Sequence, residues 1–180
     1  MRRRLHSFVP AVAATFVVVT VTVGAASVAQ ANEFVACRWL GKPSQCVSVP
    51  LESADADARA KTFSAPPSDV ARVYLVRQRT TGPRSVTPVD VGATHAGELS
   101  PMTYLVLDLP PGEHQFTAQA DGPFGRSLRF EGGQTYFAEL RLTQWLNTMY
   151  GAIEPIPEAD GRRAVAASRL ARGALGSTYP

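Results

Sequence analysis

Few side chains in this sequence could carry out acid–base chemistry. Outside the apolar N-terminal region the histidines are His95 and His114, and Asp108 and Glu139 could be proposed as a carboxylate pair. Hydrolysis requires a base, an orienting group and a nucleophile in fixed mutual geometry. One hypothesis is therefore a hydrolase that uses His114 with a nearby carboxylate.

The surrounding sequence does not favour that hypothesis. It contains no G-x-S-x-G elbow, phosphate-binding loop, zinc signature or dinucleotide fingerprint. His114 falls beside a predicted turn, where it would cover Leu109 at the rim of an apolar face, and His95 falls in a predicted loop. Asp108 and Glu139 belong to different predicted hairpins. We therefore predict that the chain is not an enzyme and has no metal or cofactor.

A second group of residues could form a binding surface. Tyr74, Tyr104 and Tyr136 each lie on the strand face opposite the aliphatic residues, and Arg129 would join them. These residues form a candidate binding face. The alternative is that the sandwich buries the tyrosine rings in an edge region or beneath a loop. Burial is favoured, because aromatic residues in strands pack in interiors more often than they form platforms.

The two cysteines, Cys37 and Cys46, are predicted to form a disulfide. Their spacing lacks the C-x-x-C pattern of redox sites, and no histidine lies close enough to complete a metal site. In an oxidising compartment a disulfide is the expected state, and a loop of this size would contribute about 2–3 kcal/mol.

The N-terminus resembles an export signal. A basic start is followed by an almost entirely apolar run over residues 9–29 and by Ala29-Gln30-Ala31. We predict a signal helix that is cleaved between Ala31 and Asn32. An uncleaved membrane anchor and lipidation at Cys37 remain as alternatives. All three place the folded part outside the cytoplasm, in the periplasm or cell envelope.

The charge balance argues against a nucleic-acid partner. The chain has 18 Lys and Arg against 15 Asp and Glu, a formal net charge of +3, and Arg2, Arg3 and Arg4 account for that excess. Nucleic-acid binding needs a clustered basic surface in the folded part.

Short alternating segments with turn signals predict β-structure. Residues 71–77 form a strand, and residues 85–91 form a weaker one that Pro88 would restrict to a sheet edge. Residues 101–118 read as a hairpin around Pro111-Gly112, with Leu107 opposite Phe116.

A second hairpin is predicted where Gly132-Gly133 separates residues 126–131 from residues 134–142, with Arg126 paired to Glu139. Residues 147–153 would add a last strand, and Asp160 would cap a weakly docked helix that ends near Gly173.

The predicted fold is thus all-β, a small antiparallel β-sandwich of about seven strands with an N-terminal signal helix and a short C-terminal helix. The predicted divisions are a signal peptide (1–31), a disulfide-containing segment and linker (32–62), the β-sandwich (63–157), and a helix with tail (158–180). Residues 52–61 suit a short helix and a mobile linker equally.

Four segments in this order resemble a family of bacterial envelope proteins known as domain of unknown function 2846. They are F-S-A-P-P-S-D-V-A-R-V-Y-L-V-R (63–77), G-E-L-S-P-M-T-Y (97–104), L-P-P-G-E-H-Q-F (109–116) and G-G-Q-T-Y-F (132–137). The resemblance extends over about residues 61–172 and implies an exported, often lipid-anchored β-sandwich without known catalytic residues. Together with the export signal, it predicts a non-enzymatic envelope module that binds a protein or polymer. Membrane contact is expected only through an uncleaved N-terminal segment or a lipidated Cys37.

Overall fold

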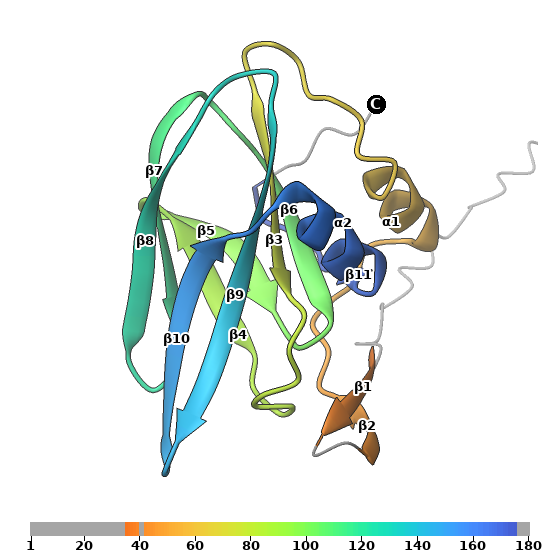
Figure 1. Ribbon diagram of the computed structural model, residues 1–180, viewed down its shortest axis with the longest axis vertical. Helices are drawn as coiled ribbons and strands as arrows, with labels where there is room; N and C mark the ends of the chain where they lie inside the picture. The colour runs from red at the N-terminus through yellow and green to blue at the C-terminus, as the bar shows by residue number, and fades with distance from the viewer. Residues whose placement is uncertain (1–34, 40–41, 176–180) are drawn as a thin grey trace, which may run out of the picture.

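The computed structural model describes residues 35–39 and 42–175, and shows two β-sheets packed face to face (Figure 1). The predicted signal helix and the cleavage residues Ala31 and Asn32 lie outside the described residues. Within the described part, no helix is long and apolar enough to cross a bilayer.

The predicted all-β sandwich is confirmed. One sheet has five strands in the order β10 (Thr148–Pro155), β9 (Thr135–Trp145), β3 (Ala71–Arg77), β6 (Thr103–Leu109) and β11 (Arg169–Leu170). The other has four, in the order β5 (Thr94–Leu99), β4 (Thr87–Val91), β7 (Gly112–Gln119) and β8 (Pro123–Phe130). A separate ribbon precedes them, made of β1 (Val35–Trp39) and β2 (Lys42–Cys46). Two helices complete the chain, α1 (Ala54–Ala60) and α2 (Glu158–Ala166).

Both predicted hairpins are wrong, although their strands exist. The strands β6 and β7, joined at Pro111-Gly112, belong to different sheets, and so do β8 and β9, joined at Gly132-Gly133. The observed hairpins are β4–β5, β7–β8 and β9–β10, together with the β1–β2 ribbon. Each predicted turn therefore carries the chain from one sheet to the other.

The glycines at the second of these crossings serve a close approach of two segments. Gly133 N donates to Val70 O over 2.8 Å, and a Cβ built on Gly132 would lie 2.1 Å from Ser68 O. Only a residue without a side chain fits against this backbone. The apolar residues of the first predicted hairpin, such as Leu107 and Phe116, still share one core, but from the two different sheets.

Two strand pairs are parallel, which the antiparallel prediction did not include. They are β3 with β9, and β11 with β6. The strand with Pro88 is flanked by β5 and β7, so the expected edge position is also wrong. Its pairing with β7 begins only at Val89, so Pro88 needs no backbone donor toward that strand.

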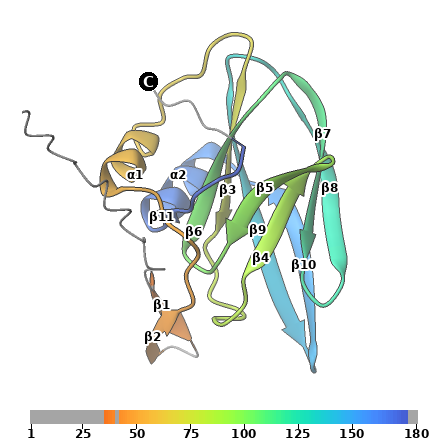
Figure 2. The ribbon, with the colours of Figure 1, turned by 180° about the vertical axis from the view of Figure 1, so that it is seen from behind.

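The strand β3 is buried on both faces. Val73 and Leu75 face the core between the sheets, while Tyr74 and Val76 belong to a second apolar cluster on the outer face of the five-stranded sheet. The helices α1 and α2 cover that outer face (Figure 2). This strand therefore reads as continuously apolar apart from its arginines.

The C-terminal helix exists but has other limits than predicted. It begins after Pro157, not Asp160, and ends at Ala166, because residues 169–170 leave it to pair with β6. Its docking is close: a Cβ on Gly161 would lie 2.3 Å from Cγ of Phe137. The short-helix alternative for residues 52–61 is likewise correct, with Ser53 as N-cap.

Candidate functional site

The two histidines lie at separate places and make only local contacts. His114 Nε2 is 2.8 Å from Pro110 O, and its ring stacks on Phe130 with centroids 6.0 Å apart. His95 Nδ1 is 3.0 Å from Asp90 Oδ1, and both side chains are about half exposed. His114 thus sits at the rim of the core, and the described contacts do not bring a carboxylate to it.

A shallow cavity of about 300 Å³ lies beside His95. Glu98 and Arg172 also line it, and Arg172 Nε is 3.7 Å from Glu52 Oε1. The lining residues include no serine, threonine or cysteine that could act as a nucleophile. Among the described residues, no cluster of three or more His, Cys, Asp or Glu side chains could hold a metal ion.

The carboxylates Asp108 and Glu139 are bound separately by arginines. Asp108 receives two hydrogen bonds from the guanidinium of Arg72, at 2.8 and 2.9 Å. Glu139 Oε2 accepts from Arg141 over 2.8 Å, and Arg79 lies 3.6 Å from its other oxygen. The predicted pair of Arg126 with Glu139 is wrong, because Arg126 lies on the other sheet, opposite Phe116. A shared carboxylate site is therefore not formed.

Two of the four residues of the candidate binding face are buried and are therefore not part of the surface. Tyr74 and Tyr104 are fully buried beneath the helices. The hydroxyl of Tyr74 donates to Ala60 O over 2.7 Å, and that of Tyr104 donates to Asp57 Oδ1 over 2.8 Å. Burial raises the pKa of Tyr74 to about 12. These two tyrosines attach α1 to the sheet; they are buried beneath the helices on inner strands, rather than in an edge region or beneath a loop as the alternative described.

The other two residues of that face lie elsewhere. Tyr136 packs on Phe130, and its hydroxyl accepts from Glu131 N over 2.9 Å. Arg129 is 79 % exposed and lies 3.5 Å from Glu113. The four residues therefore do not form one surface.

The cysteine segment forms the β1–β2 ribbon. Cys46 is fully buried and is not a free thiol. The register pairs Val35 with Cys46 and Cys37 with Ser44, so the two cysteines lie two positions apart on neighbouring strands. The side chain of Cys37 lies outside what the structure describes, and the pairing of Cys37 with Cys46 stays a prediction.

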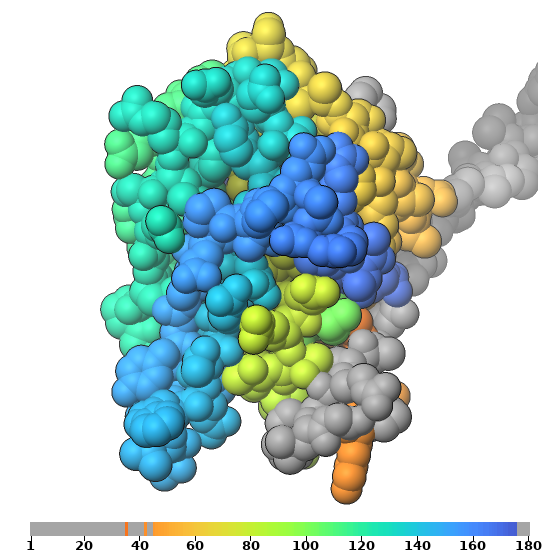
Figure 3. Space-filling view, viewed as in Figure 1, coloured from red at the N-terminus to blue at the C-terminus, as the bar shows by residue number. Residues whose placement is uncertain are grey.

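Among the described residues, the most exposed large apolar side chains gather at one hairpin. Trp145, Leu146 and Tyr150 are 69 %, 82 % and 55 % exposed. They occupy the end of β9, the turn and the start of β10, and we refer to these three residues as the hairpin tip. This hairpin projects at the lower end of the molecule (Figure 3). Trp145 pairs with Thr148 and Tyr150 with Thr143, so both aromatic rings lie on one face of the hairpin.

The backbone of the hairpin tip is itself unusual. Leu146 has φ of 51°, in the left-handed region that leucine rarely adopts, and Asn147 does not share this conformation. A two-residue turn with a positive φ only at its first position has the φ signature of a type II′ turn, in which glycine is the usual residue. An exposed leucine at this position lowers the stability of the turn. Strained residues of this kind are concentrated at functional sites, so Leu146 is a candidate functional residue.

Two cavities adjoin the hairpin tip. One, of about 230 Å³, lies among Val86, Pro88 and Leu142, and the other, of about 360 Å³, lies beside Phe124 and Tyr150. Asp121 and Met149 line both, and Asp121 Oδ2 accepts from Met149 N over 2.6 Å. This bond ties the β7–β8 turn to β10.

Arg77 fixes the neighbouring loop that connects β3 to β4. Its side chain is almost completely buried and donates to carbonyl and hydroxyl oxygens of loop 81–87 and of Leu99, over 2.8–3.2 Å. Desolvation by burial lowers its pKa to about 10. The buried guanidinium of Arg77 thus fixes Ser85 and Thr87, two residues that line the smaller cavity.

Sequence reasoning missed the hairpin tip. The second predicted hairpin ends at Leu142 and the next predicted strand begins at Asn147, so neither prediction includes Trp145 or Leu146. The available signal was two alternating runs separated by only two residues, Leu146 and Asn147.

The sequence of this chain is similar to that of a curated protein. An uncharacterized protein of Haemophilus influenzae is 24 % identical over 132 residues, which cover 71 % of this chain and 77 % of that protein. No family model matches the chain, and no solved structure matches it. The resemblance to domain of unknown function 2846 stays a prediction.

Proposed function

We propose that this protein is an exported, non-enzymatic module of the cell envelope that binds through the hairpin tip. One observation carries the proposal: Trp145, Leu146 and Tyr150 are exposed together on a projecting hairpin. Soluble proteins seldom expose contiguous large apolar groups without a binding role. Leu146 strengthens the argument, because it occupies a conformation in which a glycine would stabilise the turn.

The exported location rests on the N-terminal sequence and on the cysteines. The apolar run ending at Ala29-Gln30-Ala31 supports export, and the disulfide of Cys37 with Cys46 that we propose suits an oxidising compartment. The resemblance to an envelope family supports the same location. Intact-mass measurement of the exported protein without reductant tests both points: we expect a start at Asn32 and no free thiols.

The enzyme hypothesis has weaker support. His114 contacts a backbone carbonyl and an aromatic ring, and His95 lies on a cavity whose lining offers no hydroxyl or thiol nucleophile. The buried carboxylate of Asp108 is bound by Arg72. A binding role accounts for the hairpin tip, whereas a hydrolase would leave it unexplained.

Site-specific photocrosslinking in the native host tests the binding role. A photoreactive residue replaces Leu146 in the full chain, and a second version carries it at Arg129, which is equally exposed at the opposite end of the sandwich. We expect a discrete adduct with an envelope protein, glycan or lipid from position 146 and none from position 129. The absence of adducts from position 146, or the same adducts from both positions, contradicts the proposal.

A further inference from the structure

We propose that the hairpin tip inserts into the interfacial region of an anionic lipid bilayer. This inference rests on the proposed function and names the partner of that same surface. It differs from anchoring through the N-terminal segment, because here the folded domain itself contacts lipid. The argument has three parts: the shape of the surface, its side-chain chemistry and the charges around it.

The shape of the hairpin tip suits a bilayer better than a protein. Its apolar residues surround a two-residue turn that projects from the lower end of the molecule (Figure 3). A stable protein interface covers about 800 Å² of each partner, with some 20–30 residues on each side. Three side chains on a convex hairpin provide only a small part of such an area. A bilayer surface needs no matching concave partner, since lipids rearrange around an inserted loop.

The side chains match the depth profile of a membrane interface. Leu146, the most exposed of the three, is purely aliphatic and occupies the turn itself. Trp145 and Tyr150 follow on the strands, on one face of the hairpin. Tryptophan and tyrosine prefer the headgroup level of a bilayer, because their rings are apolar and each retains one polar group. Leucine would thus reach the acyl chains, while the two aromatic rings remain at the interface.

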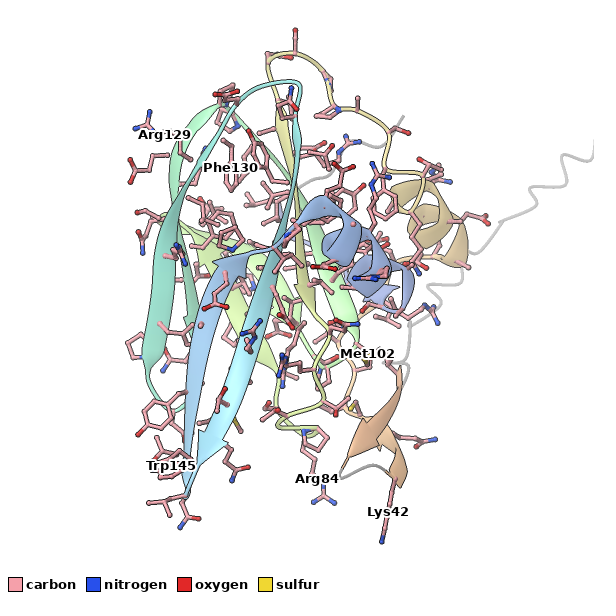
Figure 4. All side chains as sticks on the ribbon, in the orientation of Figure 1. Lys42, Arg84, Met102, Arg129, Phe130 and Trp145 are labelled. Atoms are coloured by element: carbon pink, nitrogen blue, oxygen red, sulfur yellow. The ribbon has the colours of Figure 1, made fainter. Side chains whose placement is uncertain are left out.

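Exposed cations lie at the same end of the molecule. Figure 4 shows Trp145, Arg84 and Lys42 directed toward the lower end, whereas Arg129 lies at the upper end. Arg84 is in the loop that Arg77 holds, and Val47 N donates to Pro83 O over 2.9 Å, which attaches the segment after β2 to this loop. Arg84 and Lys42 therefore lie at the same end of the molecule as the hairpin tip, and both are exposed.

The acidic groups on and beside the β9–β10 hairpin do not outweigh these cations. Glu139 and Glu154 lie within ion-pair distance of Arg141, and Glu139 also lies 3.6 Å from Arg79. Asp121, whose carboxylate accepts the backbone N–H of Met149, keeps its negative charge beside the hairpin tip and offsets one of the two cations. Arg84 and Lys42 are thus placed to meet anionic headgroups, each contributing roughly fivefold to binding.

Fluorescence quenching by brominated lipids tests whether Trp145 enters the bilayer. The full chain carries the substitution Trp39→Phe, so that Trp145 is its single tryptophan, and is mixed with vesicles of phosphatidylglycerol and phosphatidylcholine that have brominated acyl chains. We expect strong quenching and a blue shift. Replacing Leu146 with Asp should lower the apparent affinity for these vesicles, measured by the quenching titration, about tenfold. The reason is that the substitution places a charge at the turn, the part of the hairpin tip that enters the bilayer first.

A matched control separates insertion of the hairpin tip from anchoring by the N-terminal segment. A variant with Trp39→Phe, Trp145→Phe and Arg129→Trp has its single tryptophan at the opposite end, and we expect no quenching there. Arg84→Gln and Lys42→Gln should each lower the apparent affinity for the anionic vesicles about fivefold. In vesicles of phosphatidylcholine alone, each variant should bind as the protein without that substitution does.

The outcomes distinguish this inference from the proposed function. Equal quenching at positions 145 and 129, or none at 145 in anionic vesicles, overturns insertion into lipid. If position 146 nevertheless crosslinks to a single protein or glycan in cells, the binding function stands and only the lipid partner is wrong. If both experiments fail, the hairpin tip is not a binding surface.

Discussion

The guanidinium of Arg72 donates two hydrogen bonds to the carboxylate of Asp108 across the neighbouring strands β3 and β6, with both side chains nearly buried. Arg72 Nη1 also donates to Ser64 O over 3.2 Å. The geometry is the bidentate one that an arginine makes with a carboxylate, and it lies at the centre of the five-stranded sheet. Each charge is tolerated there because the other is present.

Removal of one member of this pair should destabilise the protein more than removal of both. We expect Arg72→Met to lower the free energy of unfolding by about 3–5 kcal/mol, because Asp108 is left buried and unpaired. The double variant Arg72→Met with Asp108→Leu should recover a large part of that loss. Urea unfolding of the wild type, Arg72→Met, Asp108→Leu and the double variant measures the coupling, and equal losses in Arg72→Met and the double variant contradict it.

Tyr74 should make the protein sensitive to alkali. Burial raises its pKa from 10.0 to about 12, so the folded state keeps the hydroxyl proton where the unfolded state has lost it. The stability is therefore complete below pH 10 and falls as the pH rises toward 12, by up to about 3 kcal/mol. Arg77, whose pKa burial lowers to about 10, titrates in the same range with the opposite sign, so the test compares the wild type with Tyr74→Phe between pH 9 and 12: the stability of the wild type relative to the variant should fall by this amount. A slope that is unchanged in Tyr74→Phe contradicts the assignment.

The contact of Gly161 with the ring of Phe137 predicts an unusual response to alanine. Alanine normally stabilises a helix by about 1 kcal/mol relative to glycine. Here its Cβ would lie 2.3 Å from Cγ of Phe137, and overpacking should outweigh the gain, for a net loss of about 1–2 kcal/mol.

The control for Gly161 is Gly122→Ala, since nothing lies within 4 Å of a Cβ at Gly122 and its φ is not positive. We expect a change within about 0.5 kcal/mol there. Thermal unfolding of both variants compares them. A stabilised Gly161→Ala would show that α2 can move away from the sheet at little cost.

The sequence predicts the strands of this fold better than their partners. Alternation in residues 71–77 defines β3 without error, yet the same logic made hairpins of two segments that cross between sheets. The reason is that Leu107 and Phe116 face the same core in both arrangements, across a ladder or across the gap between sheets. Local apolar patterns cannot distinguish these two cases, because the choice depends on which other strands occupy the two edges of β6 and β7.

The sequence does not reveal how the tyrosines and the hairpin tip are exposed, for a related reason: both depend on the tertiary structure. Tyr74 and Tyr104 could be recognised as aromatic strand residues, but their burial depends on α1 and α2, whose alanine-rich sequences give little sign of docking. The turn at Leu146 was obscured because leucine is an ordinary strand residue and its positive φ is visible only in the structure.

Arg77 should be essential for the loop that carries Arg84. Replacement by Met leaves the carbonyl groups of Thr81, Ser85 and Leu99 without these donors in the interior, and we expect a loss of about 3 kcal/mol or more. Arg77→Lys should recover only part of it, since an ammonium cannot reproduce the planar set of donors.

The control for Arg77 is Arg79→Met, which removes a mostly exposed cation two residues away. We expect it to cost less than about 1 kcal/mol. Urea unfolding and hydrogen exchange of residues 78–86 report the global and local effects. Similar behaviour of the two variants would mean that the loop does not depend on the buried guanidinium.

Leu146→Gly should separate stability from binding. Glycine adopts a φ of 51° without the steric cost that leucine bears, and we expect the variant to gain about 0.5–1 kcal/mol in the free energy of unfolding. Asn147→Gly, where φ is not positive, should lose stability instead. The same Leu146→Gly protein should lose lipid quenching of Trp145, because the most exposed apolar side chain is gone. A variant that is more stable but does not bind would show that the leucine is kept for contact with a partner, whereas retained binding would assign that contact to the two aromatic rings.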